Sequence, residues 1–532
     1  MEITVNSKFN YGPWRLLVPA FLVCALIFSL WHTTVQASSD VCFATADDGV
    51  AVFSSADATA VQDAVDAAVA GATVKVAGDC VGTQSRQGNN QTVYISKTLS
   101  LVGGYDTADW SAPISAESRS VLDANDGGRV LYIATGGEVA LNQLVIQNGQ
   151  TSNISGGGIY AVGTSSQQMT LTLRQVTVRN NATLGFFGKG GGIYMTGGSL
   201  DFWGVAIVGN SSAETGGGLY VNPPASNIVI VNTVIYDNSA RDLGGGLAVG
   251  GVFDLVNSTV SSNTAARAGG LYATRDVFLT NSAIVSNTTT ITRSGVWINS
   301  NMHARNSILA NNRYSSGVLE NCTGVAVTSS GNNITDGACL GLSAGAGDIM
   351  DTDPMLRPMN TTDALLPYHY PYPGSPVIDA GETPACTANL NHYAINPHFT
   401  QGQDMLFDSL GNIRYDGDGD NMVQCDIGPV EYSGEGVCNG NAANPLAAVE
   451  ELGNDVVIQV SNINQFSVGL WDAPYNGQVG NTYTAFGSYN HAGVMGDGET
   501  YFYQIESITE CRSVSSEPVW FGKVSFELTS GS

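Results

Sequence analysis

Residues 216–249 read GGGLYVNPPASNIVIVNTVIYDNSARDLGGGLAV. This stretch holds one complete repeat: a Gly triplet, an apolar residue with an aromatic, a run of β-branched residues, an Asn, and a second Gly triplet. Thr233–Tyr236 predicts a short strand, and the Asn with its small polar neighbours predicts a turn. The triplet supplies backbone that accepts positive φ. One such unit cannot bury its own apolar face, so we expect neighbouring units to stack on it.

The same unit recurs through the middle of the chain. The triplet and its aromatic return, exactly or as variants, at Gly156–Tyr160, Gly190–Tyr194, Gly216–Tyr220, Gly244–Ala248, Gly269–Tyr272 and Ser294–Trp297. An Asn recurs at steps of 24 to 32 residues, at Asn148, Asn180, Asn210, Asn238, Asn263, Asn287 and Asn312. A second Asn column lies six residues upstream, at Asn232, Asn257, Asn281 and Asn306.

This period fits one coil of a parallel β-helix, in which each coil stacks on the next at roughly 4.8 Å. Asn at the same point of every coil can hydrogen-bond to its copies above and below. We therefore expect a structural Asn ladder made of Asn180, Asn210, Asn238, Asn263, Asn287 and Asn312. A propeller blade would need ~40–45 residues, and the Gly and β-branched content opposes a helical solenoid.

The predicted fold is all-β: a right-handed, single-stranded parallel β-helix of the pectate-lyase-like type, with an N-terminal cap helix and a C-terminal β-sandwich. The helical period at Ala60–Ala70 predicts the cap, which a solenoid needs over its first coil. We divide the chain into a signal peptide (1–37), the cap (38–71), the β-helix (72–334) of roughly ten coils, a Pro/Asp-rich region (335–434) and the sandwich (435–532).

The N-terminus and the charge predict where the protein acts. Lys8 and Arg15 precede an apolar run, and Val35-Gln36-Ala37 resembles a small-residue cleavage site, which together predict a secretory signal peptide. An uncleaved anchor is the alternative; once the signal is cleaved, we expect no membrane span. The net charge is −26, from 20 basic and 46 acidic residues, which argues against nucleic acid as a partner.

The cysteines agree with export. Of nine, Cys24 lies in the signal, and eight remain: Cys42, Cys80, Cys322, Cys339, Cys386, Cys425, Cys438 and Cys511. An even number in an exported chain predicts disulfides, and counting alone leaves 105 pairings open.

The region after the repeats contains several distinctive pieces. They are, in order, Asn321-Cys322-Thr323, Thr352-Asp353-Pro354, Pro373-Gly374-Ser375-Pro376-Val377-Ile378-Asp379-Ala380-Gly381, Asp416-Gly417-Asp418-Gly419-Asp420 and Cys425-Asp426-Ile427-Gly428. In this order they resemble bacterial choice-of-anchor Q β-helix surface proteins. The Gly and Asn repeats also resemble those of polymorphic outer-membrane β-helix proteins. The resemblance covers roughly residues 60 to 432 and implies an exported, surface-associated protein with no agreed biochemical activity.

The chain departs from that group at its C-terminus, where a further domain replaces a short anchor. Gly496–Ile505 and Val524–Leu528 resemble strands of a fibronectin type III sandwich. The resemblance suggests the pairs Cys322–Cys339 and Cys386–Cys425. Assignment by domain then adds Cys438–Cys511 and Cys42–Cys80.

Three patterns point to chemistry. Asp416, Asp418 and Asp420, with Asp426 nearby, place hard oxygens in a Gly-rich loop and predict a Ca²⁺ site; a plain acidic turn is the alternative. Asp237, Asp242 and Arg275-Asp276 are the candidates for a lyase or hydrolase groove, although surface ion pairs also explain them. One aromatic per coil, at Tyr160, Tyr194, Tyr220, Tyr272 and Trp297, predicts either a stabilising stack or an exposed platform for sugar rings.

We therefore expect a secreted or cell-surface protein that acts as an adhesin, a glycan-binding protein or a structural component. Its expected partners are extracellular glycans or surface proteins, with self-association through the solenoid ends as a further expectation. The alternative function is a polysaccharide lyase or glycoside hydrolase, and no catalytic residue is assigned.

Overall fold

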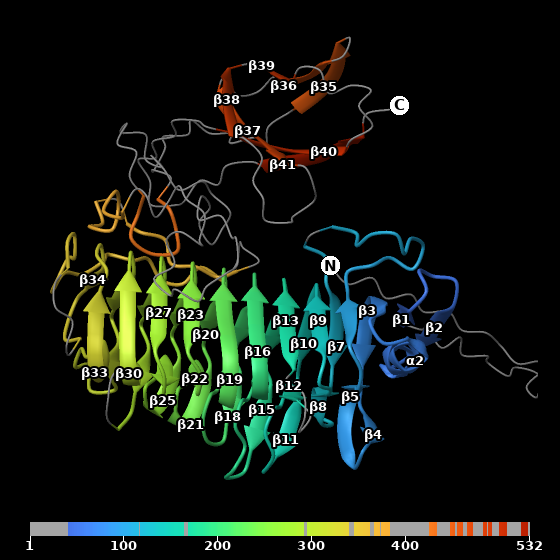
Figure 1. The fold of residues 1–532 in the computed structure, drawn as a ribbon, viewed down its shortest axis with the longest axis horizontal. Coiled ribbons are helices and arrows are strands. Elements are labelled where there is room, and N and C mark those ends of the chain that lie inside the picture. The colour runs from blue at the N-terminus through green and yellow to red at the C-terminus, as the bar shows by residue number, and fades with distance from the viewer. Residues whose placement is uncertain are drawn as a thin grey trace, which may run out of the picture. The chain divides into compact units, whose positions relative to one another are not determined.

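The computed structural model (Figure 1) describes residues 41–115, 117–163, 169–291, 295–339, 345–361, 366–372, 374–382, 425–432 and seven strands between 447 and 529. The predicted signal peptide, Asp416, Asp418, Asp420, Cys386, Cys438 and Cys511 lie outside these residues.

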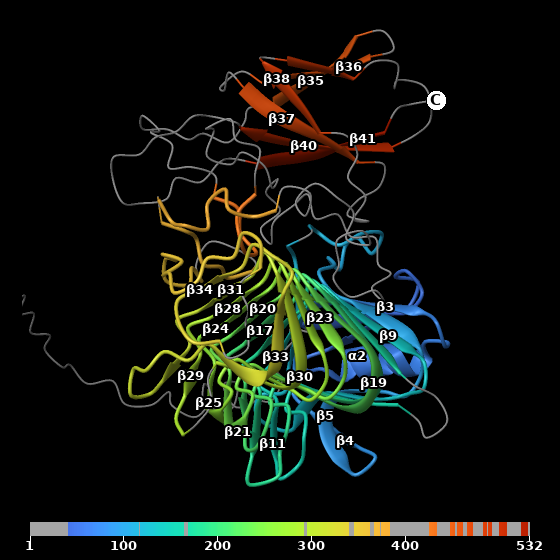
Figure 2. The same ribbon diagram turned by 60° about the vertical axis from the view of Figure 1, so that its left-hand side comes forward.

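The repeats form a parallel β-solenoid of about nine turns, close to the ten expected. From β8 to β32 each coil passes through three sheets in turn, and Figure 2 shows the strands of successive coils stacking along each of them. The first sheet contains β3 (Thr73–Val81), β5 (Asn89–Ile95), β6 (Leu99–Val102), β8 (Arg129–Ala134), β9 (Glu138–Asn142), β12 (Ile159–Val162), β13 (Thr170–Arg174), β16 (Ile193–Trp203), β19 (Leu219–Val231), β22 (Leu247–Val249), β23 (Phe253–Val256), β26 (Leu271–Ala273), β27 (Val277–Thr280), β30 (Val296–Arg305) and β33 (Cys322–Ser329).

The other two sheets are built from shorter strands. The second contains β7 (Ser120–Asp123), β10 (Leu144–Gln147), β14 (Thr177–Arg179), β17 (Ala206–Val208), β20 (Val234–Tyr236), β24 (Thr259–Ser261), β28 (Ala283–Val285), β31 (Ile308–Ala310) and β34 (Ile334–Thr335). The third contains β11 (Gln150–Ser152), β15 (Ala182–Leu184), β18 (Ser211–Ser212), β21 (Ser239–Leu243), β25 (Thr264–Arg267), β29 (Thr288–Thr289) and β32 (Arg313–Tyr314).

Parallel pairing puts equivalent residues of successive coils in register. Ile193, Tyr194 and Met195 of β16, for example, pair with Leu219, Tyr220 and Val221 of β19. Alternate residues point inward, so the apolar members of each pair fill one continuous core that includes Phe202, Phe253 and Leu131. The intervening residues form columns on the outer surface.

The Asn ladder lies at the corner between the second and third sheets. Its members are buried, and from Asn210 to Asn312 each Oδ1 accepts hydrogen bonds from the main-chain N–H and the Nδ2 of the Asn one coil earlier; Asn263, for example, accepts both from Asn238 at 2.9 and 3.0 Å. At the two ends, Asn181 Oδ1 accepts from Gly149 N, and Asn321 Oδ1 accepts from Asn312. The ladder runs through Asn181, Asn210, Asn238, Asn263, Asn287, Asn312 and Asn321.

One predicted ladder residue was wrong by a single position. Asn180 and Asn148 instead occupy the preceding corner position, where φ is 54° for both. Asn tolerates this left-handed conformation, so two adjacent Asn columns are expected to look alike in sequence. In the Asn180–Asn181 pair the second Asn is the buried ladder member.

A second ladder lies at the corner between the first and second sheets. Asn232, Asn257, Asn281 and Asn306 take φ values of 46–47° there. The next residue in each coil accepts the main-chain N–H of its counterpart in the coil before, from Thr233 to Ser258 to Ser282 to Ser307. The upstream Asn column is therefore explained by backbone conformation rather than by amide pairing.

The Gly triplet forms the third corner, and its residues have different tasks. Gly216 has φ +69°, which favours glycine. Gly217 has no room for a side chain, because an added Cβ would lie 2.3 Å from the carbonyl oxygen of Gly245 in the next coil.

The predicted cap helix is confirmed as α2 (Thr59–Ala67). It packs with β1 (Cys42–Thr45), which pairs antiparallel with β2 (Val52–Ser55) and β3. Gln62 of α2 reaches the first coil: its Oε1 accepts from Tyr94 N at 2.7 Å, and its Nε2 donates to Tyr94 O at 3.1 Å. This side chain thus replaces the strand that would otherwise precede β5. A hairpin of β4 (Gln84–Arg86) and β5 lies beside it.

Two predicted disulfides are present. Cys42–Cys80 ties the cap to β3, and Cys322–Cys339 ties β33 to the segment after β34. Cys425 is also disulfide-bonded, but its partner lies outside the described residues, so Cys386–Cys425 and Cys438–Cys511 stay predictions.

The Pro-Gly-Ser-Pro motif joins the last coils to residues 425–428. Ala380 O accepts from Asn332 Nδ2 at 2.8 Å, while Val377 O accepts from Ile427 N at 2.9 Å. Ser375 Oγ donates to Pro354 O at 2.6 Å. Residues 374–381 are therefore a structural junction, and Val377 belongs to the same apolar cluster as Ile308 and Ala310 of the second sheet.

Seven C-terminal strands form antiparallel pairs in the order β35-β36-β39-β38-β37-β40-β41. They are β35 (Ala447–Leu452), β36 (Asp455–Val460), β37 (Gln465–Trp471), β38 (Thr482–Phe486), β39 (Ser488–His491), β40 (Thr500–Ser507) and β41 (Lys523–Thr529). A sandwich of the fibronectin type III kind stays a prediction.

The Asn ladder gives a testable expectation for stability. Asn263→Ala leaves the main-chain N–H of Asn238 and the Ile235 carbonyl without their partners inside the solenoid. We expect a loss of about 3 kcal/mol in the free energy of unfolding, measured by chemical denaturation. Asn90→Ala, at an exposed Asn, is the control and should change it by less than ~0.5 kcal/mol. Equal effects of the two substitutions would contradict the ladder's role.

Candidate functional site

The first sheet carries an outward column of aromatic side chains, here called the tyrosine ladder. Its members are Tyr94, Tyr132, Tyr160, Tyr194, Tyr220, Tyr272 and Trp297, and the in-register pairing of the first sheet aligns them. Each is half-buried, while the residues on either side of it face the core. The sequence analysis missed Tyr94 and Tyr132, because their coils lack the Gly triplet that identified the other positions; the Val-Tyr-Ile and Leu-Tyr-Ile alternation was the available signal.

The rings touch along the column with two geometries. Tyr160, Tyr194 and Tyr220 are stacked, with centroids 5.1 and 5.4 Å apart and ring planes within 12°. Tyr94 and Tyr132, like Tyr132 and Tyr160, meet edge to face at 5.4 and 5.3 Å. Each contact adds to the stability of the solenoid, so the stabilising interpretation is supported. The stacked rings present edges and hydroxyls to solvent.

Cations lie over several of these rings. The guanidinium of Arg129 lies 5.0 and 4.6 Å from the ring centroids of Tyr132 and Tyr160. The Lys189 ammonium lies 5.2 Å from Tyr220, and it pairs with Glu214 at 3.2 Å. Arg267 lies 5.8 Å from Trp297 and pairs with Asp242. Such contacts stabilise a cation beside an aromatic surface.

Amides complete the polar edge of the column. The Tyr220 hydroxyl donates to Asn222 Oδ1 at 3.3 Å, and Asn299 Nδ2 donates to the Tyr272 hydroxyl at 3.1 Å. Amides, hydroxyls and aromatic rings together are the groups from which a sugar-binding surface can be built.

The column is interrupted once. Ala248 pairs with Tyr220 on one side and with Tyr272 on the other, and it is buried. The ladder is therefore divided into five tyrosines and a Tyr272–Trp297 pair, whose rings are tilted at 60°.

Packing within the ladder changes its acid–base behaviour. Burial, followed by the neighbouring Tyr160 and Tyr220, raises the pKa of Tyr194 to about 12. Burial also raises the pKa of Tyr160 and lowers that of the Arg129 guanidinium. Tyr160 and Tyr194 consequently stay neutral hydrogen-bonding groups at physiological pH.

The residues proposed for an enzyme groove have other contacts. Asp242 pairs with Arg267, and Asp276 accepts from Asn301 N at 3.1 Å and from Ser300 Oγ. Asp237 is a corner residue with φ 54°, equivalent to Asn180. Within these described contacts no paired carboxylates of the glycosidase kind appear.

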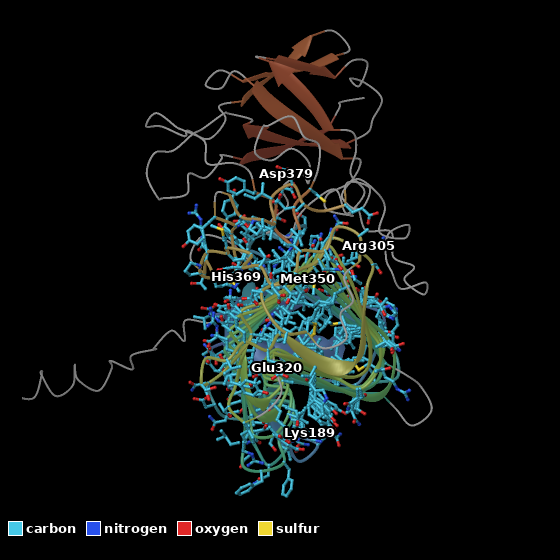
Figure 3. The ribbon with its side chains drawn as sticks, turned by 90° about the vertical axis from the view of Figure 1, so that its left-hand side faces the viewer. Lys189, Arg305, Glu320, Met350, His369 and Asp379 are labelled. Atoms are coloured by element: carbon cyan, nitrogen blue, oxygen red, sulfur yellow. A yellow bond between two sulfur atoms is a disulfide. The ribbon has the colours of Figure 1, made fainter. Side chains whose placement is uncertain are left out.

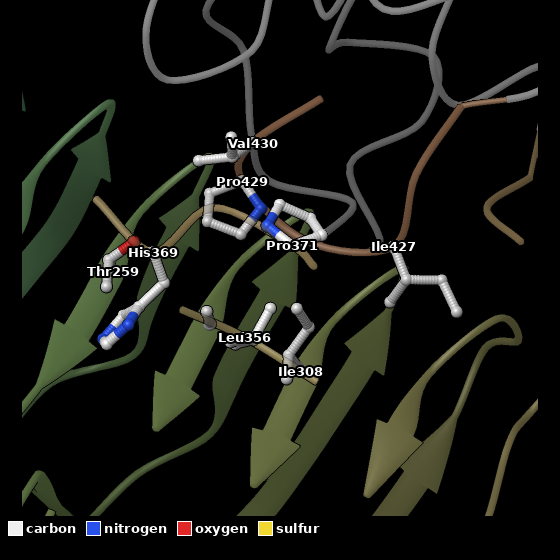
Figure 4. A pocket seen from close by; sticks show the side chains of 9 residues that line it. Thr259, Ile308, Leu356, His369, Pro371, Ile427, Pro429 and Val430 are labelled. Atoms are coloured by element: carbon white, nitrogen blue, oxygen red, sulfur yellow. The ribbon is translucent and has the colours of Figure 1, made fainter. Parts of the chain in front are cut away.

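A hydrogen-bonded Ser–His pair lies in a small pocket on the second sheet. His369 Nε2 is 2.8 Å from Ser261 Oγ, and its Nδ1 is 2.7 Å from the Arg357 carbonyl oxygen. Figure 4 shows the mainly apolar surroundings, including Leu356 and Ile308. The pocket has room for about one water molecule, and Ser261 is fully buried. Burial lowers the pKa of His369. This geometry fixes His369 and the Arg357 carbonyl against the second sheet, and a pocket of this size has no room for a polymer.

Figure 3 places His369 and Lys189 far apart, so the pocket and the tyrosine ladder are separate surfaces.

Of the four residues predicted to hold Ca²⁺, Asp426 alone lies among the described residues. The described residue, Asp426, is buried, and its two carboxylate oxygens accept from the main-chain N–H groups of Asp379 and Tyr432. Among the residues that the structure describes, no three His, Cys, Asp or Glu side chains form a group that could hold a metal ion. A Ca²⁺ loop at Asp416, Asp418 and Asp420 stays a prediction.

No helix within the described part of the chain is long and apolar enough to span a membrane. Comparison with known proteins gives no match, either to a family model or to a curated protein.

The tyrosine ladder predicts an alkaline transition. The pKa of Tyr194 is higher in the folded protein than its ordinary value of 10.0, so its contribution to stability is complete below pH 10.0 and is lost as the pH rises through about 12. We expect the tyrosinate absorbance of the native protein to show a late-titrating class, and Tyr194→Phe to reduce it. Identical titrations of the two proteins would contradict the packing described here.

Proposed function

We propose that this protein is a secreted or cell-surface β-helix protein that binds an extracellular glycan along its tyrosine ladder. The observation that carries the proposal is the column of half-buried aromatic rings with the cations and amides beside it. A single coil supplies one aromatic and its polar neighbours, and the next coil repeats them one strand spacing further on. A repeating surface of this kind suits a repeating polymer.

The chemistry favours a carbohydrate over other polymers. Pyranose rings have apolar C–H faces and polar hydroxyl edges, which match aromatic rings and amide or hydroxyl groups respectively. The net charge of −26 opposes a nucleic acid. Of the cations in the column, Lys189 and Arg267 are paired with carboxylates, so the surface offers little free positive charge to a polyanion.

Three further proposals concern the setting of this activity. The signal-like N-terminus and the even number of remaining cysteines support export. The motifs between Asn321 and Gly428 support membership of the choice-of-anchor Q type of surface protein, with a fibronectin type III-like domain at the C-terminus. Self-association would then involve the C-terminal end of the solenoid, because α2 covers the other end.

Retention on insoluble polysaccharides tests the proposal directly. We expect the exported protein to be retained on at least one neutral polysaccharide of a panel. Tyr194→Ala combined with Tyr220→Ala should weaken binding about tenfold or more, because both stacked rings and the Lys189 contact are lost. Tyr236→Ala, at a half-buried tyrosine on the second sheet, is the matched control and should bind normally.

The same assay separates binding from catalysis and from a structural role. Retention without new chain ends or unsaturated products supports a binding protein, whereas product release would favour the lyase or hydrolase. If no polysaccharide retains the folded protein, glycan binding is wrong and a structural role with protein partners takes its place.

Calcium gives an independent prediction. If Asp416, Asp418 and Asp420 hold Ca²⁺, adding Ca²⁺ after EDTA treatment should raise the melting temperature, because an ion that binds only the folded state stabilises it. Asp418→Asn should abolish the shift. A melting temperature that does not respond to either treatment would identify the loop as a plain acidic turn.

A further inference from the structure

The largest exposed aromatic side chains among the described residues lie in one corner loop, residues 185–189, between β15 and the Gly triplet. Phe186 is 67% exposed and Phe187 is 72% exposed. Leu184 and Ile154, at 44% and 45%, extend the apolar surface onto the loop of the preceding coil. Exposing several large apolar groups together is unfavourable in water and is typical of a binding surface.

The loop is held by residues of three other coils. Asn153 Oδ1 accepts from Phe186 N at 3.0 Å, and Ser155 Oγ accepts from Lys189 N at 3.2 Å. Lys189 then pairs with Glu214 of the following coil. Arg241, two coils further on, donates to the Phe186 carbonyl oxygen at 3.1 Å and lies 5.3 Å from its ring centroid.

These contacts bring the loop to a particular place along the tyrosine ladder. Arg241 belongs to the same coil as Ala248, the position where the column lacks an aromatic. Lys189 belongs to the loop and lies over Tyr220, the last ring before that position. The loop lies in the coil of Tyr194, two coils before the interruption, and Arg241 links it to the coil of Ala248.

The loop also supplies an open aromatic face, which the stacked rings of the ladder lack. The faces of Tyr160, Tyr194 and Tyr220 cover one another, so these residues offer mainly edges. Arg241 occupies one face of Phe186, whereas no ring or cation contact to Phe187 is seen within the described residues. Face-on contact with a sugar ring needs an open aromatic face, and Phe187 provides one.

We propose that Phe186 and Phe187 form a stacking subsite for one pyranose unit of the neutral glycan that lies on the tyrosine ladder. This inference rests on the proposed function. Lys189 makes the subsite continuous with the ladder.

Two other occupants fit less well. A second copy of the chain would need roughly 800 Å² per partner, far more than a few side chains supply. An anionic membrane surface would be repelled by the overall net charge of −26.

Calorimetric titration of the exported protein with neutral oligosaccharides of increasing length, prepared from the polysaccharide that retains it, tests the subsite. We expect Phe187→Ala to weaken binding of the longer oligosaccharides about tenfold. Phe187→Tyr should restore it, because the ring is kept. Ile114→Ala, at a side chain that is 66% exposed on a different loop, should have no effect.

The outcomes separate this inference from the proposed function. If Phe187→Ala binds every oligosaccharide like the wild type while the Tyr194/Tyr220 double variant does not, the subsite is wrong and the ladder proposal survives. If the wild type binds none, both fail. Two other results would also overturn the subsite. One is that the wild type sediments with phosphatidylserine vesicles and Phe187→Ala does not, while glycan binding is unchanged. The other is that the wild type forms a dimer that Phe187→Ala does not form, again with unchanged glycan binding.

Discussion

In-register parallel stacking is the constraint on which this structure depends. Because each strand pairs with its counterpart one coil away, any residue type that recurs in the repeat becomes a column in space. The core, the Asn ladder, the Ser and Thr ladder and the tyrosine ladder are four consequences of this one arrangement. In the Asn ladder a buried amide finds its partner in the neighbouring copy, so this polar corner is enclosed with its groups paired. The upstream Asn column differs, because the Asn281 amide atoms are buried with no partner among the described residues.

The same constraint connects stability with the candidate function. Stacking the tyrosines on each other stabilises the solenoid and at the same time fixes their hydroxyl edges at a regular spacing. The cost is that the ring faces are hidden. Side chains in the corner loops need not stack on one another in this way. The loops differ in length from coil to coil, whereas the strands must keep the register of their neighbours. The exposed Phe186 and Phe187 arise in such a loop, two coils before the coil in which Ala248 interrupts the column.

Much of this fold could be predicted from the sequence, because each coil places Gly, Asn and β-branched residues at the same positions. Their spacing in the sequence therefore equals the length of one coil. The cap helix and the Cys42–Cys80 and Cys322–Cys339 pairs followed from pattern and resemblance. Asn180 was wrongly assigned to the Asn ladder because two Asn columns lie next to each other in sequence. The first column adopts a left-handed backbone conformation, and the second forms the hydrogen-bonded ladder. Tyr94 and Tyr132 were missed because alternation in a single short strand is a weak signal. The cation contacts of Lys189 and Arg241 join residues of different coils, which no one-dimensional pattern reveals.

A crystal structure of the exported protein with a bound neutral oligosaccharide would test glycan binding along the tyrosine ladder. We expect electron density for a chain of sugar units that lies along Tyr160, Tyr194 and Tyr220 and continues to Phe187. Density in the Ser261–His369 pocket, on the β35–β41 domain, or on the second sheet instead would contradict it.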